Sequence, residues 1–229
     1  MSEPTIIACD NLDEAIQKYS ELGYRLDMIF PADSPREALM SEPSATAGGL
    51  TSDSLHRETI RLKLSQPNVQ PPNTAGGSDW VTGRAGMEYR DLIPGRLGGK
   101  AIASHIRLAD EGPVADYVHY HKVDFQMIYC LKGRIKVVYQ DQGPPFWLET
   151  GDCVVQPPEI RHRVLECTAV AEVLEVTMPA EHETWVEHEM SLPNDIVNPD
   201  REFNGQRFSL TTNPTNDLSI ASLLSPFQK

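Results

Sequence analysis

Two histidines separated by one residue, His119 and His121, are the side chains best suited to chemistry in this sequence. On a β-strand, side chains at i and i+2 point to the same face, so both imidazoles would enter one space. Gln126 follows five residues after His121, and His162 lies further downstream. Neutral imidazoles favour zinc, iron, nickel or copper over magnesium or calcium. We therefore predict that four residues hold one metal ion: His119, His121, Gln126 and His162.

The spacing of the first three residues resembles the first of two sequence motifs of the cupin superfamily. That motif contains an opening glycine, a His-x-His pair, a glutamate and a closing glycine. In this chain His119, His121 and Gly133 match it, Gln126 stands in place of the glutamate, and Pro113 stands in place of the opening glycine. The resemblance implies a small jelly-roll β-barrel with the metal ion inside.

The second cupin motif is matched further along the chain, in the segment that leads to the third histidine. Gly151, Pro157 and His162 occupy its positions, whereas Glu159 and Glu166 replace a glycine and an asparagine. The two motifs together span about half of the expected barrel. The resemblance therefore adds His162 to the ligand set that the first motif begins.

Strand periodicity divides the chain independently of the motifs. From Trp80 onward, short alternating apolar runs are separated by turn residues, a pattern typical of an antiparallel sandwich or barrel. Residues 80–190 are therefore predicted to form the barrel, residues 67–79 a linker, and residues 191–229 an extended C-terminal arm that either wraps a neighbour or is partly disordered. A short helix is expected to begin at Ala180, with His182 and His188 exposed to solvent.

Residues 1–66 predict a small βαβββ module, so the expected fold is mainly β with one α+β element. The helix should begin at the N-cap Asn11 or Asp10 and end at Gly23. Residues 10–24 resemble a half-module of the glyoxalase and vicinal-oxygen-chelate superfamily. The metal positions of that family would fall near residues 5–7 and 63–65, which contain no His or Glu. We therefore expect a docking or dimerising module without catalysis, and a homodimer.

The bulk composition excludes several classes of function. The chain has 229 residues, 40% of them hydrophobic, and a formal net charge of −13, which argues against a general nucleic-acid binder. Its four cysteines form no CxxC pair, which favours a reducing compartment. No signal peptide and no apolar run of about 18 residues are found. We expect a cytoplasmic protein whose partner is a small molecule, with no nucleic-acid or membrane partner.

The alternation of side chains along a strand predicts further residues of the site, beyond the four proposed ligands. If His162 points into the barrel, Glu166 follows it on the same face, and His105 lies within another expected strand. A carboxylate and an imidazole are both common acid–base groups. We therefore predict Glu166 and His105 as catalytic residues, although a β-bulge would reverse each assignment.

The expected chemistry follows from a neutral donor set of three imidazoles and one carboxamide. A divalent zinc, iron, nickel or manganese ion would keep its full charge there and polarise a carbonyl or carboxylate oxygen. This predicts a lyase, isomerase or cyclase that acts on a small oxygen-rich substrate. Two alternatives stay open: a non-haem Fe(II) dioxygenase of the cupin type, and a cupin that binds a ligand without turnover.

Overall fold

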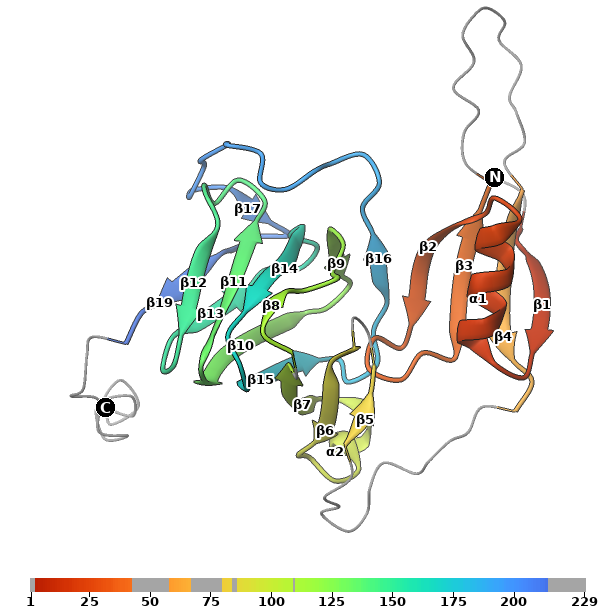
Figure 1. Cartoon of the computed structure of the whole chain (residues 1–229), viewed down its shortest axis with the longest axis horizontal. Helices are drawn as coiled ribbons and strands as arrows, with labels where there is room; N and C mark the ends of the chain where they lie inside the picture. The colour runs from red at the N-terminus through yellow and green to blue at the C-terminus, as the bar shows by residue number, and fades with distance from the viewer. Residues whose placement is uncertain (1–2, 43–57, 67–79, 84–85, 109, 214–229) are drawn as a thin grey trace, which may run out of the picture.

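Strands dominate the computed structural model, which describes residues 3–42, 58–66, 80–83, 86–108 and 110–213. They form two large sheets that face each other, and the N-terminal residues extend one of these sheets to the side (Figure 1). The predicted mainly β barrel with a small N-terminal α+β part is therefore confirmed.

The N-terminal part has the expected order of one helix and four strands. Its elements are β1 (Thr5–Cys9), α1 (Leu12–Glu21), β2 (Arg25–Phe30), β3 (Glu37–Ser41) and β4 (Thr59–Leu64). Asn11 is the N-cap of α1, and its side-chain oxygen accepts a hydrogen bond of 3.2 Å from the backbone N–H of Glu14. The apolar stripe of α1 packs on this sheet, with Leu12 buried against Ile60 and Leu62.

The N-terminal strands are continuous with the barrel. The first sheet has the order β1-β4-β3-β2-β16-β9-β14-β11-β12, with β8 beside β14. Its barrel strands are β16 (Thr184–Val186), β9 (His119–His121), β14 (His162–Cys167), β11 (Arg134–Tyr139), β12 (Phe146–Glu149) and β8 (Gly112–Pro113). Because β2 pairs with β16, the N-terminal module shares a hydrogen-bonded sheet with the metal-binding region predicted from the sequence.

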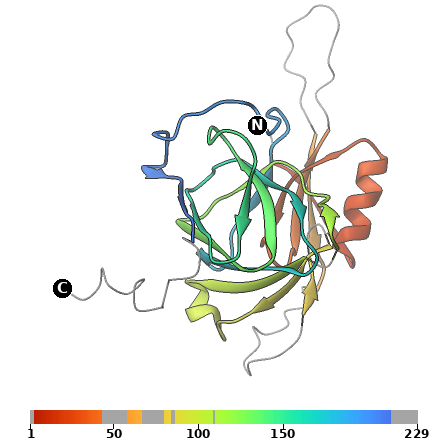
Figure 2. The same ribbon diagram turned by 60° about the vertical axis from the view of Figure 1, so that its left-hand side comes forward.

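The second sheet closes the other side of the barrel, in the order β19-β13-β10-β15-β7-β6-β5. Its strands are β19 (Ser209–Thr211), β13 (Cys153–Gln156), β10 (Phe125–Lys132), β15 (Ala171–Met178), β7 (Ile102–Leu108), β6 (Glu88–Asp91) and β5 (Val81–Thr82). The strands of the two sheets enclose a common interior (Figure 2). Alternate residues from both sheets fill it with an apolar core. The short segment α2 (Arg96–Gly99) connects β6 to β7.

Residues 191–213 pack on the barrel of their own chain. They contain the hairpin of β17 (Glu202–Phe203) and β18 (Gln206–Arg207), and β19 pairs with β13. Phe203 is buried in the main core, and Phe208 packs against the same cluster. Residues 214–229 of the predicted arm and the predicted linker 67–79 lie outside the described residues.

The helix expected from Ala180 is wrong. This segment leads into β16, which hydrogen-bonds to β2 on one side and to β9 on the other. Sheet pairing here overrides the local helical pattern, because both neighbours of β16 present backbone groups that need partners. The resulting strand joins the N-terminal module to the barrel.

The cysteines and the helices add two further observations. All four cysteines are free, and Cys130 and Cys167 lie within the apolar core. Burial raises the pKa of the Cys130 thiol to about 11, which keeps it protonated near neutral pH. Among the described residues, no helix has the length and hydropathy that a membrane crossing requires.

Replacement of Phe203 tests whether the C-terminal segment is part of the folded barrel. We expect Phe203→Ala to lower the free energy of unfolding by about 3 kcal/mol, because it removes a buried aromatic ring from the core. The matched control is Leu210→Ala on β19, where the side chain is exposed and the loss should stay below about 1 kcal/mol. Equal unfolding free energies for wild type and Phe203→Ala in urea denaturation would contradict this packing.

Candidate metal centre

Three histidines converge in the barrel interior. His119 and His121 come from β9, and His162 begins the neighbouring strand β14, where it is the register partner of His119. Their ligand nitrogens lie within 4.8 Å of one another, and the three residues are only 1%, 6% and 7% exposed. Such a spacing lets three imidazoles bind a single ion.

Hydrogen bonds at Nδ1 fix the tautomer and the orientation of two of the three imidazoles. Nδ1 of His119 lies 2.8 Å from the carbonyl oxygen of Tyr117, and Nδ1 of His162 lies 2.9 Å from that of Ile160. A carbonyl oxygen can only accept, so in both neutral rings the proton is on Nδ1 and the lone pair is on Nε2. This arrangement gives two Nε2 atoms the protonation state that a metal ion requires.

The third imidazole is oriented by a hydroxyl group on the adjacent strand. Nδ1 of His121 lies 2.9 Å from Oγ1 of Thr184, its register partner on β16. Thr184 is buried, so this contact restricts the rotation of the ring. Of the two strands beside β9, β14 therefore provides the third imidazole, and β16 provides the hydroxyl that orients His121.

Gln126 reaches the barrel interior from β10 and is only 1% exposed. Its Nε2 donates a 2.5 Å hydrogen bond to Oε1 of Glu175 on β15. This bond identifies which end of the amide is the donor and leaves the carbonyl oxygen as the atom that could bind a cation. Whether Gln126 is a ligand stays a prediction.

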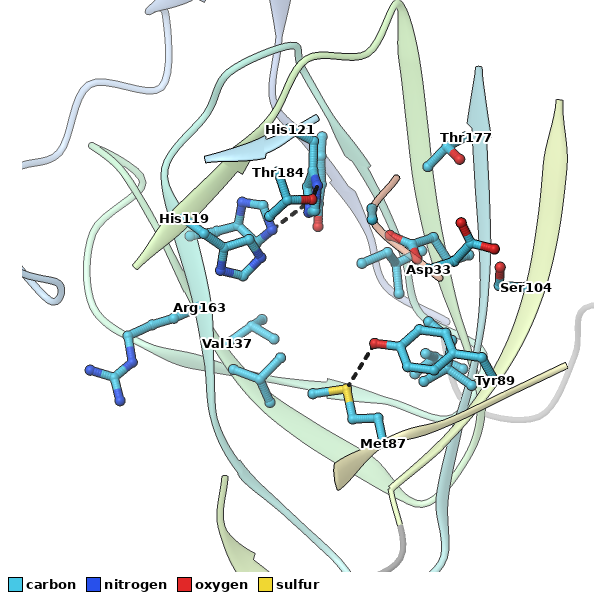
Figure 3. Close-up of a pocket in the computed structure, with 18 of the residues that line it drawn as sticks. Asp33, Met87, Tyr89, Ser104, His119, His121, Val137, Arg163, Thr177 and Thr184 are labelled. Carbon is cyan, nitrogen blue, oxygen red and sulfur yellow. Dashed lines mark hydrogen bonds between the residues drawn. The ribbon is translucent and has the colours of Figure 1, made fainter. Parts of the chain in front are cut away.

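A cavity of about 70 Å³ adjoins the three histidines (Figure 3). Aliphatic side chains from both sheets form part of its wall, including Ile102, Ile106, Ile128, Val137, Val164 and Val173. Polar groups line the remainder, among them Glu175 and the buried Gln156. Oε1 of Gln156 accepts a hydrogen bond of 2.6 Å from Tyr139, and its Nε2 lies 3.4 Å from Nε2 of His162.

Glu166 lies away from this cavity. The register between β11 and β14 shifts between Lys136 and Val137, which leaves Leu165 as the extra residue of a β-bulge. The bulge reverses the parity that made Glu166 a neighbour of His162. The Glu166 side chain is 43% exposed and lies 3.6 Å from the ammonium of Lys136. The structure therefore does not bring this predicted catalytic residue to the site.

His105 also lies elsewhere, on the outer face of β7. Its neighbours Ser104 and Ile106 line the cavity, so alternation turns His105 outward. Its Nε2 is 2.7 Å from a carboxylate oxygen of Glu172, and its Nδ1 is 2.9 Å from Nη2 of Arg90. These contacts satisfy the ring within a polar cluster outside the barrel, and the predicted catalytic role is not supported by this location.

His182 is a residue that the sequence analysis placed wrongly in solvent. It is 7% exposed, lines the cavity and meets the ring of His121 edge-on at a centroid distance of 5.3 Å. Burial lowers the pKa of His182, which favours its neutral form. The acidic residues next to His182 suggested an exposed segment. The connection from β15 to β16 nevertheless brings the His182 side chain to the cavity.

Comparison with known protein families supports the barrel assignment. Residues 107–177 match the family model described as the cupin domain. The matched segment contains the three converging histidines and Gln126, and with the fold it supports the predicted relation to the cupin superfamily. No curated protein matches the chain. The resemblance of residues 1–66 to a glyoxalase half-module stays a prediction.

Several solved structures are similar to the barrel. An RmlC-like cupin from Shewanella frigidimarina is 24% identical over 44% of this chain and 84% of its own, with a TM-score of 0.37. The polyketide cyclase RemF from Streptomyces resistomycificus is 20% identical over 51% and 82%, with a TM-score of 0.41. KdgF from Halomonas sp. is 19% identical over 44% and 86%, with a TM-score of 0.37.

Removal of a converging imidazole should remove most of the bound metal. We expect wild type to retain about one divalent transition-metal ion per chain after equilibrium dialysis, and His119→Ala or His162→Ala to retain a small fraction of that amount. The control is His188→Ala, because His188 is exposed and lies 2.9 Å from the carbonyl oxygen of Leu26, outside the cavity. Elemental analysis that finds equal metal in all four proteins would refute the site.

Proposed function

We propose that this protein is a metal-dependent enzyme that acts on a small carbonyl or carboxylate substrate by Lewis-acid chemistry, as a lyase, isomerase or cyclase. The observation that carries the proposal is the convergence of His119, His121 and His162 beside a cavity. The cupin-domain match over the same residues supports it.

The donor set that we propose carries no charge. The three imidazoles are joined by the carbonyl oxygen of Gln126, whose amide nitrogen is already occupied by Glu175. A divalent ion held by these groups would keep its full charge and polarise a substrate oxygen. The aliphatic wall of the cavity would exclude water and strengthen this interaction.

Glu175 replaces Glu166 as the carboxylate proposed to move a proton. It lines the cavity and lies on the same face of β15 as Val173 and Thr177. The 2.5 Å bond from the Gln126 amide holds one carboxylate oxygen in place. A carboxylate fixed next to a polarised carbonyl substrate is well placed to remove an α-proton or to return it.

The Fe(II) dioxygenase and the non-catalytic binding protein are the competing functions. The common iron triad includes a carboxylate ligand, whereas the proposed donors are three imidazoles and a carboxamide. Both competitors can be separated by assay of metal-loaded protein on small 2-oxo acids, hydroxy acids and unsaturated carboxylates, with and without oxygen. Turnover only in oxygen would support the dioxygenase, and saturable binding without turnover would support the binding protein.

Substitution of Glu175 tests the proposed proton transfer. We expect turnover that is independent of oxygen, and a fall in kcat of about 10²-fold or more in Glu175→Gln with bound metal unchanged. Glu166→Gln is the matched control, because its side chain is outside the barrel and its loss should leave kcat within about twofold. Equal kcat values for Glu175→Gln and wild type would exclude this role.

Substitution of Gln126 tests the importance of a neutral donor set. We expect Gln126→Glu to retain the metal, since a carboxylate oxygen also binds divalent ions, and to lower kcat because the added negative charge weakens polarisation of the substrate. The measurement pairs elemental analysis with kcat on the same preparation. Identical kcat at equal metal content would show that charge at this position does not matter.

A further inference from the structure

The N-terminal module contributes part of the cavity wall. Ala32 and Asp33, in the connection from β2 to β3, line the same cavity as the three histidines. Asp33 lies between the histidines and Ser104 in the view of Figure 3. An ion pair also joins the module to the segment before β16: both Nη atoms of Arg36 donate hydrogen bonds to the carboxylate of Glu181, at 3.1 and 2.8 Å. A chain segment outside the cupin-domain match thus reaches the site.

Asp33 is fixed by a bridging guanidinium. Nη2 of Arg96 lies 2.5 Å from Oδ2 of Asp33, and Nε of Arg96 lies 2.8 Å from Oδ2 of Asp91. Burial disfavours the charge on Arg96, but the two carboxylates raise its pKa above the ordinary value. Arg96 and Leu97 both have positive φ, 48° and 50°, a conformation that costs energy in non-glycine residues. The ion pairs compensate for this backbone strain and hold the Asp33 carboxylate at the cavity.

Among the described residues, no donor binds the other carboxylate oxygen of Asp33, although the carboxylate interacts electrostatically with His182, which also lines the cavity. Oδ1 is buried and makes no hydrogen bond to any residue that the structure describes. A desolvated carboxylate oxygen without a donor is unfavourable, so a ligand that supplies one would gain binding energy there. An ionised carboxylate only accepts, which restricts the complementary group to a hydrogen-bond donor.

We infer that Asp33 is a specificity-determining residue that accepts a hydrogen bond from a hydroxyl or ammonium group of the substrate. This inference rests on the proposed function, in which the substrate's oxygen atoms lie at the histidines. The cavity lining also contains aliphatic side chains from both sheets. The substrate class is therefore a short molecule with a carbonyl or carboxylate end and a donor-bearing end.

Short straight-chain hydroxamates of graded length can test this inference, because a hydroxamate binds metal ions at one end. The far end would carry a methyl, a hydroxyl or an ammonium group, and binding to metal-loaded protein would be measured by calorimetry. At the best length, wild type should bind the hydroxyl or the ammonium probe about tenfold more tightly than the methyl probe. Comparison of the hydroxyl and ammonium probes then separates the two kinds of donor.

Asp33→Leu should lose this preference, because the new side chain accepts no hydrogen bond, while binding of the methyl probe stays within about twofold. Glu166→Leu is the control, since the Glu166 carboxylate lies outside the cavity lining, beside the ammonium of Lys136, and its loss should leave the preference intact. Thermal melting and metal content would show that both variants are folded and loaded.

Two results would overturn the role of Asp33. The first is equal binding of all three end groups to the wild-type protein, and the second is a preference for the donor-bearing probes that survives in Asp33→Leu. If no hydroxamate binds metal-loaded wild type, the proposed metal-dependent function fails and the inference fails with it.

Discussion

The pairing of one short strand, β9, with its two neighbours is the constraint on which the site depends. His162 lies directly opposite His119 on β14, and Thr184 lies directly opposite His121 on β16. Side chains in such cross-strand positions approach closely, so the ladder itself brings the third imidazole and the orienting hydroxyl to the first two. A shift of one residue in either pairing would turn these side chains to the other face of the sheet. The backbone hydrogen bonds that build the barrel therefore also assemble the candidate metal centre.

This arrangement connects the N-terminal module to the chemistry. The strand that orients His121 is the same strand that pairs with β2, and the connection after β2 carries Asp33 to the cavity wall. The N-terminal module therefore pairs with β16 and also contributes Ala32 and Asp33 to the cavity wall. The barrel supplies imidazoles and an aliphatic wall, whereas the module supplies a charged group that the barrel interior would not stabilise without Arg96. We propose that metal binding and substrate specificity depend on different parts of the chain that share one sheet.

The sequence predicted what depends on local pattern and missed what depends on packing. The His-x-His spacing, the N-cap at Asn11 and most strands follow from short-range periodicity, and the structure contains them. The sequence analysis placed Glu166 at the site because a β-bulge leaves no clear mark in the sequence. It placed His105 there because strand alternation does not show which face of a strand lies inside the barrel. His182 was missed because surrounding acids suggested an exposed segment, whereas pairing of β16 with two strands draws it inward. Asp33 had no local signal, since its role depends on contact between segments far apart in the chain.

X-ray absorption spectroscopy of zinc-loaded protein tests the central claim most directly, because it counts the imidazoles around the ion without reference to activity. The account predicts about three imidazole nitrogens and additional oxygen in the first shell, at distances of about 2.0–2.2 Å. A shell with one imidazole or none, or one that contains sulfur at about 2.3 Å, would contradict it.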